Sequence, residues 1–342
     1  MPTVLVTEPI HADGLAILRA RPGLDVVEGA GLSPQALRAA EAEASALLVR
    51  FHRCDAAFFE RAPKVRVVAR YGVGVDLIDL HAARDRGVCV AITADANTQS
   101  VVEHATWMLL SLAKPFDRWR RGMAALSSIP RERWATLTPS SYASRDEGLG
   151  GELGGKTLLV VGLGRIGRRV AQVATAIGMQ VTVVDPYIDR APGLALGYRF
   201  ADSLRDALPR ADYLTVHCPR NAETLGMIGA DELALLPRGA AVVNCARGGI
   251  VDESALAAAL AAGHLSGAGI DVFDAEPPPP DHPLLALPNV FLTPHSAAAT
   301  REAAWRMATH AARNIVDFLD GRLDPAMVYP VPPRAGAGSA RA

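Results

Sequence analysis

The sequence lacks three features that would indicate particular classes of protein. Its charges balance, with 35 Lys and Arg against 36 Asp and Glu, so no basic field attracts nucleic acid or an anionic membrane surface. No apolar run reaches membrane-spanning length, and the first residues, MPTVLVTEPI, lack the basic start and long apolar core of a secretion signal. We therefore expect a cytoplasmic protein that binds neither nucleic acid nor a membrane.

Cysteine is scarce and scattered. The four cysteines, Cys54, Cys89, Cys218 and Cys245, lie far apart and form no CxxC pair. This spacing is typical of reduced, buried thiols and not of a disulfide framework or a zinc site. We predict no metal site.

Hydrophobic residues, in contrast, are plentiful, at 50% of a chain of 342 residues. This length is enough for two domains, each with a core of its own. In the first hundred residues β-rich runs alternate with helix-like stretches, beginning with TVLVTEP, GLAILRA and LDVVEG. Such alternation indicates a small parallel α/β layer.

A long helix is expected after Thr98. Ser100 and Glu103 have the spacing of a capping box, apolar residues recur on one helical face, and Pro115 marks the end. The residues that follow, 127–151, are rich in Ser, Pro, Gly and charge and predict a loop or irregular insertion.

Six short runs rich in Val, Leu and Ile follow from residue 156: TLLVVG, VTVVD, YLTVH, AAVVNC, AGIDVF and VFLTPH. Helix-like segments separate most of them, as a doubly wound dinucleotide-binding domain requires. The last helical stretch, 301–319, stops before Gly321, a natural C-cap. The tail beyond residue 330 is expected to be disordered.

The sequence GLGRIG lies directly between an expected strand and an expected helix. Gly162 permits the tight turn, Gly164 lets the backbone approach a pyrophosphate, and Gly167 allows close helix packing. Backbone amides near Arg165 and Ile166 should donate to the phosphates at the helix N-terminus. Alone, such a motif could also be a plain glycine-rich connection.

Asp185 favours the dinucleotide interpretation. It ends the next apolar strand, roughly 20 residues after the glycines, where a carboxylate can accept both ribose hydroxyls. The same charge would repel a 2′-phosphate, so NAD is favoured over NADP, although Arg190 nearby acts in the opposite direction. The alternative role for Asp185 is that of a turn residue before Pro186.

Three polar side chains directly follow later strands: Arg247, Glu276 and His295. That places them at the ligand-binding edge of a parallel sheet. His295 could exchange a proton with a hydroxyl or carbonyl oxygen, Glu276 could orient the imidazole and favour its charged form, and Arg247 could hold a carboxylate. Each alone could equally be structural; their joint occurrence favours hydride-transfer chemistry.

Five segments together resemble the D-isomer-specific 2-hydroxyacid dehydrogenases: RYGVGVDLIDL, GGKTLLVVGLGRIG, NCARGGIVDESAL, DVFDAEP and LTPHSAAAT. The resemblance extends to about residue 329. It implies an NAD-dependent homodimer that interconverts a small D-2-hydroxy acid and a 2-oxo acid, such as a phosphoglycerate dehydrogenase or a hydroxypyruvate or glyoxylate reductase. No regulatory domain is expected after the last helix.

The resemblance also implies an α/β fold of two Rossmann-like domains. A doubly wound, parallel-sheet NAD-binding domain, residues 100–295, would be inserted into a smaller flavodoxin-like substrate domain, residues 1–99 and 296–330. Residues 331–342 would form the disordered tail. Hinge helices would lie near residues 100 and 300.

The resemblance assigns the site residues as well. Arg247, Glu276 and His295 would form the catalytic set. Asp271 and Cys245 would line the nicotinamide end of the cofactor site, and Cys218 would lie near the adenosine.

The family's substrate loop matches RYGVGVD. The resemblance of this segment to that loop implies that the backbone amides of Val73 and Gly74 bind the substrate carboxylate, with Tyr71 beside them. Arg50 lies near the position of a phosphate-binding arginine in the phosphoglycerate branch.

Two departures from the family leave the substrate's side group open: TADANTQSVVEH lacks the usual Pro-Gly before the Asn, and the 127–151 stretch is longer than usual. Formate dehydrogenases of this fold have Gln where this chain has Glu276, which argues against formate. A phosphite dehydrogenase and an NAD(H)-sensing, corepressor-like binding protein are the alternatives.

Overall fold

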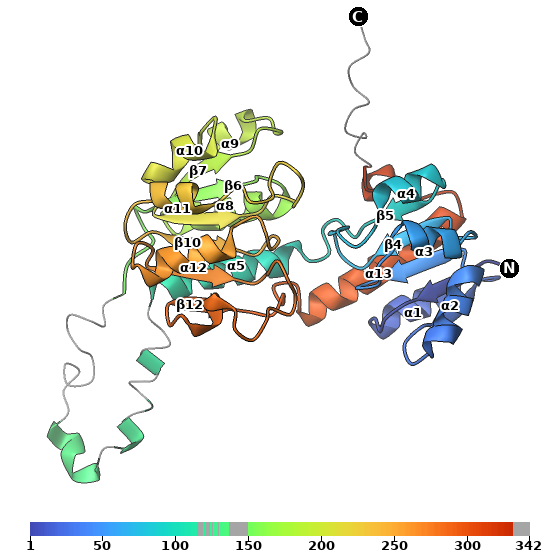
Figure 1. Cartoon of the computed structure of the whole chain (residues 1–342), viewed down its shortest axis with the longest axis horizontal. Helices are drawn as coiled ribbons and strands as arrows, with labels where there is room; N and C mark the ends of the chain where they lie inside the picture. The colour runs from blue at the N-terminus through green and yellow to red at the C-terminus, as the bar shows by residue number, and fades with distance from the viewer. Residues whose placement is uncertain (115–118, 121–123, 125, 129, 137–149, 331–342) are drawn as a thin grey trace, which may run out of the picture. The chain divides into compact units, whose positions relative to one another are not determined.

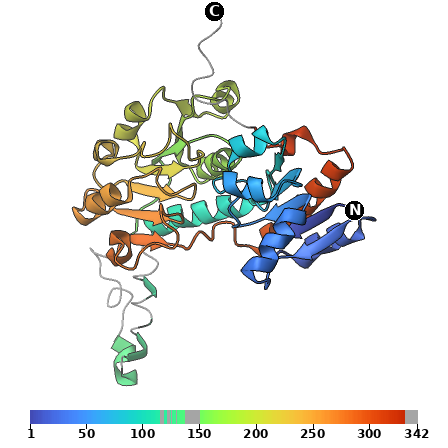
Figure 2. The same ribbon diagram turned by 45° about the vertical axis from the view of Figure 1, so that its right-hand side comes forward.

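The computed structural model describes residues 1–114, 119–120, 124, 126–128, 130–136 and 150–330. The chain divides into unit 1, which comprises Met1–Ser100 and the chain from Ala298, and unit 2, Val101–Ala297 (Figure 1 and Figure 2). The expected tail, 331–342, and much of the expected insertion, 127–151, lie outside the described residues. Assignment of unit 1 to the substrate stays a prediction.

Unit 1 contains a five-stranded parallel sheet with strand order β2-β1-β3-β4-β5. This is the flavodoxin-like order, which confirms the expected fold of this part of the chain. The strands are β1 (Thr3–Val6), β2 (Asp25–Glu28), β3 (Ala46–Val49), β4 (Val67–Arg70) and β5 (Cys89–Ala91).

Alternating side chains of these strands supply two separate apolar cores. Val4 and Val6 of β1 face α1 (Ala12–Ala20) and α13 (Arg301–Leu319). Leu5, between them, faces the opposite core. That core is covered by α2 (Pro34–Glu43), α3 (Ala56–Arg61) and α4 (Leu80–Asp85). Because both faces are covered, the central strand β3 is apolar and buried throughout, whereas the edge strand β2 begins at Asp25 and ends at Glu28, both exposed.

The long helix α5 (Thr98–Ala113) starts earlier than the capping-box spacing suggested. Ser100 lies inside its first turn and not at its N-cap, so that prediction was wrong. The Ser100 hydroxyl is 2.7 Å from the hydroxyl of Thr300, which also caps α13 by accepting from Ala303 N–H. The Ser100 hydroxyl therefore forms a hydrogen bond with a residue distant in the sequence, where the local spacing had predicted a hydrogen bond to the start of the helix. The end of α13 before Gly321, whose φ is 69°, is confirmed.

Unit 2 contains a seven-stranded parallel sheet with strand order β12-β11-β10-β9-β6-β7-β8. All six expected strands are present, and the two-residue β8 is an addition too short to leave a sequence signal. The order reverses between β6 and β9, and in doubly wound sheets ligands bind at such a switch point. The strands are β6 (Thr157–Val161), β7 (Gln180–Val184), β8 (Arg199–Phe200), β9 (Tyr213–Val216), β10 (Ala241–Asn244), β11 (Gly267–Ile270) and β12 (Val290–Leu292).

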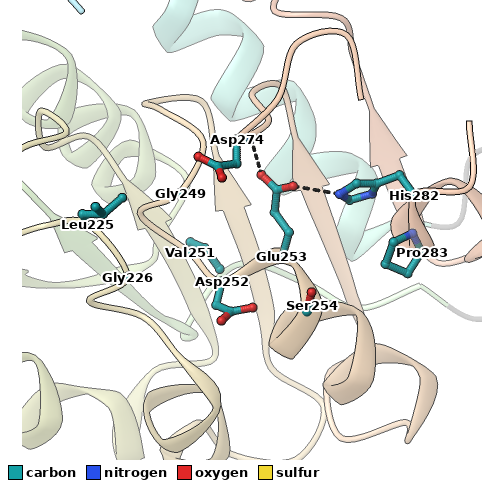
Figure 3. Close-up of a pocket in the computed structure, with 10 residues that line it drawn as sticks. All are labelled: Leu225, Gly226, Gly249, Val251, Asp252, Glu253, Ser254, Asp274, His282 and Pro283. Atoms are coloured by element: carbon teal, nitrogen blue, oxygen red, sulfur yellow. Dashed lines mark hydrogen bonds and ion pairs between the residues drawn. The ribbon is translucent and has the colours of Figure 1, made fainter. Parts of the chain in front are cut away.

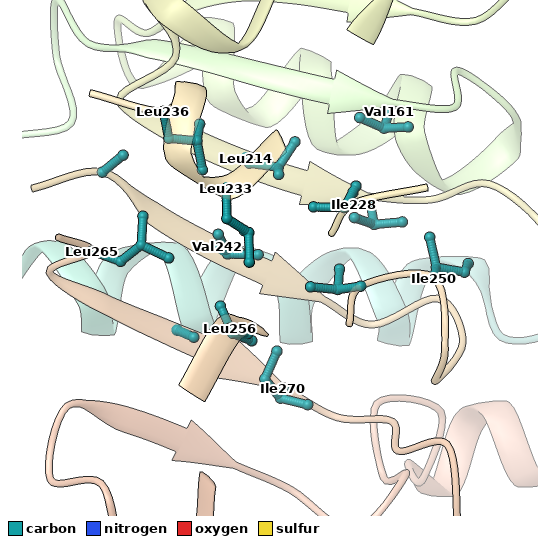
Figure 4. Close-up of a cluster of buried hydrophobic side chains, with 14 of the residues drawn as sticks. Val161, Leu214, Ile228, Leu233, Leu236, Val242, Ile250, Leu256, Leu265 and Ile270 are labelled. Atoms are coloured by element: carbon teal, nitrogen blue, oxygen red, sulfur yellow. The ribbon is translucent and has the colours of Figure 1, made fainter. Parts of the chain in front are cut away.

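One face of this sheet forms the large core shown in Figure 4, where Leu214 and Val242 of the strands meet Leu233 of α11 (Ala230–Leu235) and Leu256 of α12 (Glu253–Ala261). The shorter helices are α9 (Ala191–Ala195), α10 (Leu204–Ala207), η1 (Leu126–Ser128), η2 (Arg131–Thr136), η3 (Leu208–Arg210), η4 (Pro283–Ala286) and, in unit 1, η5 (Pro325–Met327).

The opposite face is covered by α5 and α8 (Arg165–Ala176). Glycine in β11 makes the approach of α5 close: a Cβ on Gly269 would lie 2.9 Å from Cβ of Met108, and one on Gly267 would lie 2.8 Å from Leu112. The apolar stripe of α5 therefore lies directly against the sheet. None of the helices described combines the length and apolar character of a membrane span.

Candidate active site

The glycine turn between β6 and α8 has the geometry that a dinucleotide requires. Gly162 has a φ of 90°, and a Cβ there would lie 2.7 Å from the backbone nitrogen of Cys218. A Cβ on Gly167 would lie 2.0 Å from the carbonyl oxygen of Gly162. These two glycines let the turn close onto β9 and let α8 pack against the turn.

Gly164 is different, because a Cβ there would meet nothing within 4 Å. It is the N-cap of α8 and supplies no side-chain hydrogen bond to the helix. The amides of the first turn, which includes Arg165 and Ile166, thus begin a helix with no side-chain cap, and the space beside Gly164 is open. A pyrophosphate fits this cradle, since it would supply the acceptors and the negative charge that a helix N-terminus favours.

Asp185 follows β7 and contacts the glycine turn directly. One carboxylate oxygen accepts a hydrogen bond from Leu163 N–H at 2.8 Å, and the other accepts from Tyr187 N–H at 2.9 Å. Each carboxylate oxygen has a second lone pair, so both remain able to accept from a ribose hydroxyl. Asp185 therefore shapes the turn as well as offering negative charge at the edge of the sheet.

The thiols at this edge are neutral. Burial, with a smaller contribution from the charge of Asp185, raises the pKa of Cys218 to about 11. Burial and then the charge of Asp271 raise the pKa of Cys245, whose Sγ lies 3.6 Å from Sδ of Met108. Neither thiol is a nucleophile at neutral pH.

Arg247 lies in the loop that follows β10. Asn244, the last residue of that strand, accepts from Ala246 N–H at 3.0 Å and donates to the Arg247 carbonyl at 2.9 Å. A Cβ on Gly248 would lie 2.0 Å from the carbonyl carbon of Phe273. Glycine at this position therefore lets the Arg247 loop contact the loop after β11, which carries Glu276.

Glu276 and His295 form a close pair. Nδ1 of His295 lies 2.7 Å from Oε2 of Glu276, and Oε1 of Glu276 accepts from Phe273 N–H at 3.1 Å. Because a carboxylate only accepts, the pair assigns the hydrogen of the imidazole to Nδ1. Nε2 then presents a lone pair when the ring is neutral and a donor when it is charged.

Two influences act on the pKa of Glu276 in opposite directions: its burial, and its hydrogen-bonded and charged partners. Burial alone raises the pKa of this carboxyl, but hydrogen bonds from His295 and Phe273 N–H, with the charges of His295 and Arg247, lower it overall. Glu276 is therefore ionised at neutral pH. Its side chain is 37% exposed and that of His295 is 43% exposed, so a ligand can reach the pair.

Asp271 supports the turn that carries His295. Its carboxylate is fully buried and accepts from the Thr293 hydroxyl at 2.6 Å, Ser296 N–H at 2.7 Å and Ala297 N–H at 3.0 Å. His295 itself has a φ of 50°, and its N–H donates to the Asp271 carbonyl at 2.7 Å. Asp271 thus holds this strained turn from both sides of His295.

A side chain from α5 extends this network. Nε2 of His104 lies 3.0 Å from the Thr293 hydroxyl, which already donates to Asp271 and therefore accepts from His104. The relay from α5 to the loop after β12 was not foreseen from the sequence, because His104 and Thr293 are 189 residues apart.

The expected substrate loop lies in unit 1, after β4. Gly72 has a φ of 124°, and its N–H donates to the buried Thr93 hydroxyl at 2.9 Å. Nε of Arg70 donates to the Gly74 carbonyl at 2.7 Å, and its Nη1 donates to the Tyr71 carbonyl. Arg70 engages two of the loop's carbonyls and adds positive charge beside the loop, which favours anion binding by its amides.

Arg50 directly follows β3, the neighbour of β4 in the sheet. Its guanidinium lies against two aromatic rings, 4.9 Å from the Phe51 centroid and 5.3 Å from the Tyr71 centroid. The Tyr71 hydroxyl donates to the Ala304 carbonyl at 2.9 Å. Backbone N–H groups of Arg50 and Phe51 both donate at 2.8 Å to the carboxylate of Glu8. Glu8 follows β1 at the same sheet edge, so the rule that found Arg247 could have found it.

The structure therefore gathers the predicted residues into groups within each unit. In unit 2 the β6, β7 and β9 ends carry Gly162, Gly164, Asp185 and Cys218, with Gly167 in the first turn of α8. The β10 to β12 ends carry Cys245, Arg247, Asp271, Glu276 and His295. In unit 1 the β3 and β4 ends carry Arg50, Tyr71, Val73 and Gly74.

The family model for the D-isomer specific 2-hydroxyacid dehydrogenase, NAD binding domain, matches residues 106–297. The glyoxylate reductase of Aeropyrum pernix is 37% identical over 96% of this chain and 96% of its own length. The chain belongs to the D-isomer specific 2-hydroxyacid dehydrogenase family. NAD is the cofactor of this domain.

Other relatives agree on the family. The D-3-phosphoglycerate dehydrogenase of Methanocaldococcus jannaschii is 38% identical over 94% of this chain, but the chain spans only 58% of that relative. A Thermus thermophilus protein of known crystal structure superimposes with a TM-score of 0.80 at 38% identity, covering 94% of this chain and 98% of that one.

Proposed function

We propose that this chain catalyses NAD-dependent interconversion of a small D-2-hydroxy acid and the corresponding 2-oxo acid. The observation that carries the proposal is the 2.7 Å contact between Nδ1 of His295 and Oε2 of Glu276, next to the charge of Arg247. His295 is the acid-base group, Glu276 is the carboxylate that orients it, and Arg247 is the cation. These are the three groups that 2-hydroxy acid chemistry needs.

His295 would move the proton. In the oxidation of a hydroxy acid, neutral Nε2 accepts the hydroxyl proton; in reduction, protonated Nε2 donates it to the carbonyl oxygen. Glu276, ionised at neutral pH, favours the charged imidazole that forms during oxidation. The nicotinamide, when bound, supplies the chemistry of hydride transfer.

Arg247 would bind the substrate carboxylate and polarise the neighbouring carbonyl, since its planar guanidinium can form two parallel hydrogen bonds to a carboxylate. The amides of Val73 and Gly74 are proposed to bind the same carboxylate. Arg70 supports this proposal, because it donates hydrogen bonds to two carbonyls of the loop and places a positive charge beside the loop amides.

Asp185, Cys218, Cys245 and Asp271 are proposed to line the cofactor. Arg190, which could have favoured NADP, is 2.8 Å from the carboxylate of Asp202 and 5.7 Å from the ring centroid of Phe200. These contacts support the preference for NAD.

Arg50 is proposed to contact the distal end of the substrate. A guanidinium stacked on Phe51 and Tyr71 keeps its N–H edge available for an anion. The relatives include both a glyoxylate reductase and phosphoglycerate dehydrogenases. Both kinds of substrate therefore belong in the test.

The test is an NADH-oxidation screen across glyoxylate, hydroxypyruvate, pyruvate, phosphohydroxypyruvate and bulkier 2-oxo acids. We expect turnover of at least one small member and loss of that turnover in Arg247→Ala and His295→Ala. Tight NADH binding without turnover of any oxo acid would contradict the proposal and favour a nucleotide-sensing protein. The homodimer and the cytoplasmic location stay predictions, and sedimentation tests the first.

A further inference from the structure

A largely buried carboxylate outside the catalytic set joins the two ends of the segment that carries Glu276. Glu253, the first residue of α12, accepts from Asp274 N–H through Oε1 at 2.6 Å and lies 2.8 Å from Nε2 of His282 through Oε2 (Figure 3). The side chains of Glu253 and His282 are 15% and 10% exposed. The contact between these two side chains is therefore largely shielded from water, where a charge-assisted hydrogen bond is strongest, whereas the hydrogen bond from Asp274 N–H lies at the surface.

The hydrogen bonds of His282 identify its donor atom. Leu284 N–H donates to Nδ1 at 3.3 Å and caps η4, so Nδ1 is an acceptor and carries no hydrogen. Nε2 then carries the hydrogen and donates it to Glu253. The ring also packs edge-on against Phe273, with centroids 5.5 Å apart. Phe273 in turn donates its N–H to Glu276.

The segment between the two contacts, 274–282, has little freedom of its own. It reads DAEPPPPDH, with Glu276 directly before four consecutive prolines, and each proline fixes its own φ and restricts the residue before it. A short, stiff segment anchored at both ends leaves few positions for the side chain it carries. Loss of one anchor would let the whole segment shift.

We propose that Glu253 is a positioning residue for the catalytic pair: it anchors both ends of the 274–282 segment to α12 and so holds Glu276 against His295. The catalytic consequence rests on the proposed function, whereas the positioning does not. The structure places a cavity of about 350 Å³ beside this carboxylate, lined also by Ser254, Asp274 and Pro283, so the segment has room to move if it is released.

The two carboxylates face different charged groups. Glu276 faces His295 and Arg247. Glu253 faces His282, and the side chain of Asp274 lies 3.2 Å from Arg220. Removal of charge at Glu253 therefore acts on Glu276 through the position of the segment and not through direct contact.

The experiment compares wild type, Glu253→Gln, Glu276→Gln and the double variant in NADH oxidation with the substrate found in the screen. The two donors meet different oxygens of Glu253, so the amide introduced by Glu253→Gln would keep an acceptor for one donor and turn an NH2 group toward the other. We expect a roughly tenfold lower kcat for Glu253→Gln, an unchanged Kd for NADH, and an alkaline limb of kcat/KM moved to lower pH, as in Glu276→Gln. The double variant should lose little more than Glu276→Gln alone, because both changes act on one contact.

The matched control is Glu232→Gln, which removes another carboxylate at a helix start of the same unit, where Glu232 accepts from Gly229 N–H at 3.1 Å. It should leave the pH profile unchanged. Additive losses in the double variant, or a normal pH profile for Glu253→Gln, would overturn the positioning role. If Glu253→Gln does not fold, His282→Gln is assayed in its place, because it removes the contact of the 282 end of the segment with Glu253.

A second readout separates this inference from the proposed function. The ring protons of His295 are titrated by NMR in wild type and in Glu253→Gln, with no substrate present. A midpoint at lower pH in the variant supports the positioning role even if the wild type reduces no oxo acid. An unchanged midpoint contradicts it even if the wild type is an active dehydrogenase.

Discussion

Glu276 and His295 lie 19 residues apart in the sequence, and their side chains meet at 2.7 Å. They emerge from successive strands, β11 and β12, which are neighbours in the sheet. Residues directly after β11 hold both loops: Phe273 N–H fixes the glutamate, and Asp271 holds the turn of the histidine. The contact is thus set by the ends of two paired strands, a rigid support for a proton-transfer group.

Glu276→Gln should shift the pH range of activity. The pKa of Glu276 is lowered in the folded chain, so the folded protein keeps this charge below the ordinary pKa of a glutamate and loses it only as pH falls through the lowered value. Above that pH, the negative charge of Glu276 favours the protonated form of His295. Without it, the alkaline limb of 2-oxo acid reduction should move to lower pH, measured as kcat/KM against pH. An unmoved limb would show that the carboxylate does not act on the imidazole.

Arg247→Lys should weaken substrate binding and leave the cofactor site intact. Lysine keeps the charge but not the planar pair of donors, so roughly 1.5 to 3 kcal/mol of charge-assisted hydrogen bonding is at stake. We expect kcat/KM for the 2-oxo acid to fall about tenfold to a hundredfold. Fluorescence titration with NADH should give the wild-type Kd; a matching loss there would indicate a collapsed loop.

Asp185→Asn should reduce the preference for NADH over NADPH. The substitution removes the charge that would repel a 2′-phosphate and weakens the acceptor for a ribose hydroxyl. We expect kcat/KM with NADH to fall about tenfold and that with NADPH to rise. Asp189→Asn is the control, because Asp189 is an exposed carboxylate of the same loop that caps Ala191 N–H at 3.0 Å. Equal effects of both variants would argue against a cofactor contact.

Thr293→Val should destabilise unit 2. The hydroxyl connects His104 to the buried carboxylate of Asp271, and valine has nearly the same shape without the donor. Loss of these hydrogen bonds should lower the free energy of unfolding by about 1 to 3 kcal/mol, as measured by denaturant titration. Thr106→Val, which removes only a hydrogen bond to the carbonyl of Val102 in the same helix, should cost less.

Arg70→Lys should raise KM for the 2-oxo acid with little change in kcat. The guanidinium donates to the carbonyls of Gly74 and Tyr71, and an ammonium cannot reproduce both contacts in the same plane. We expect KM to rise roughly tenfold, from the loss of about one charged hydrogen bond. Arg66→Lys, at an exposed position four residues earlier, should behave as wild type. If Arg70→Lys keeps the wild-type KM, the loop does not bind the substrate carboxylate.

Much of the fold was predictable from local pattern. Apolar runs separated by helix-like segments predicted the strands of unit 2, and GLGRIG predicted the turn between β6 and α8, because glycine spacing reflects backbone conformation directly. The two-residue β8 was missed, and the start of α5 was misplaced at Ser100. β8 is too short to leave a local signal, whereas at Ser100 the contact with Thr300, distant in the sequence, outweighed the local spacing.

The sequence by itself determined which residues stand at the ends of strands: Arg247, Glu276, His295 and Asp185 were identifiable because an apolar run followed by a polar residue marks a sheet edge. Only the tertiary structure decided their partners. Glu253 meets His282 across 29 residues and His104 meets Thr293 across 189, and such pairs depend on strand order and helix packing. A side chain's type is local information, whereas the atom it contacts is set by how the whole unit folds.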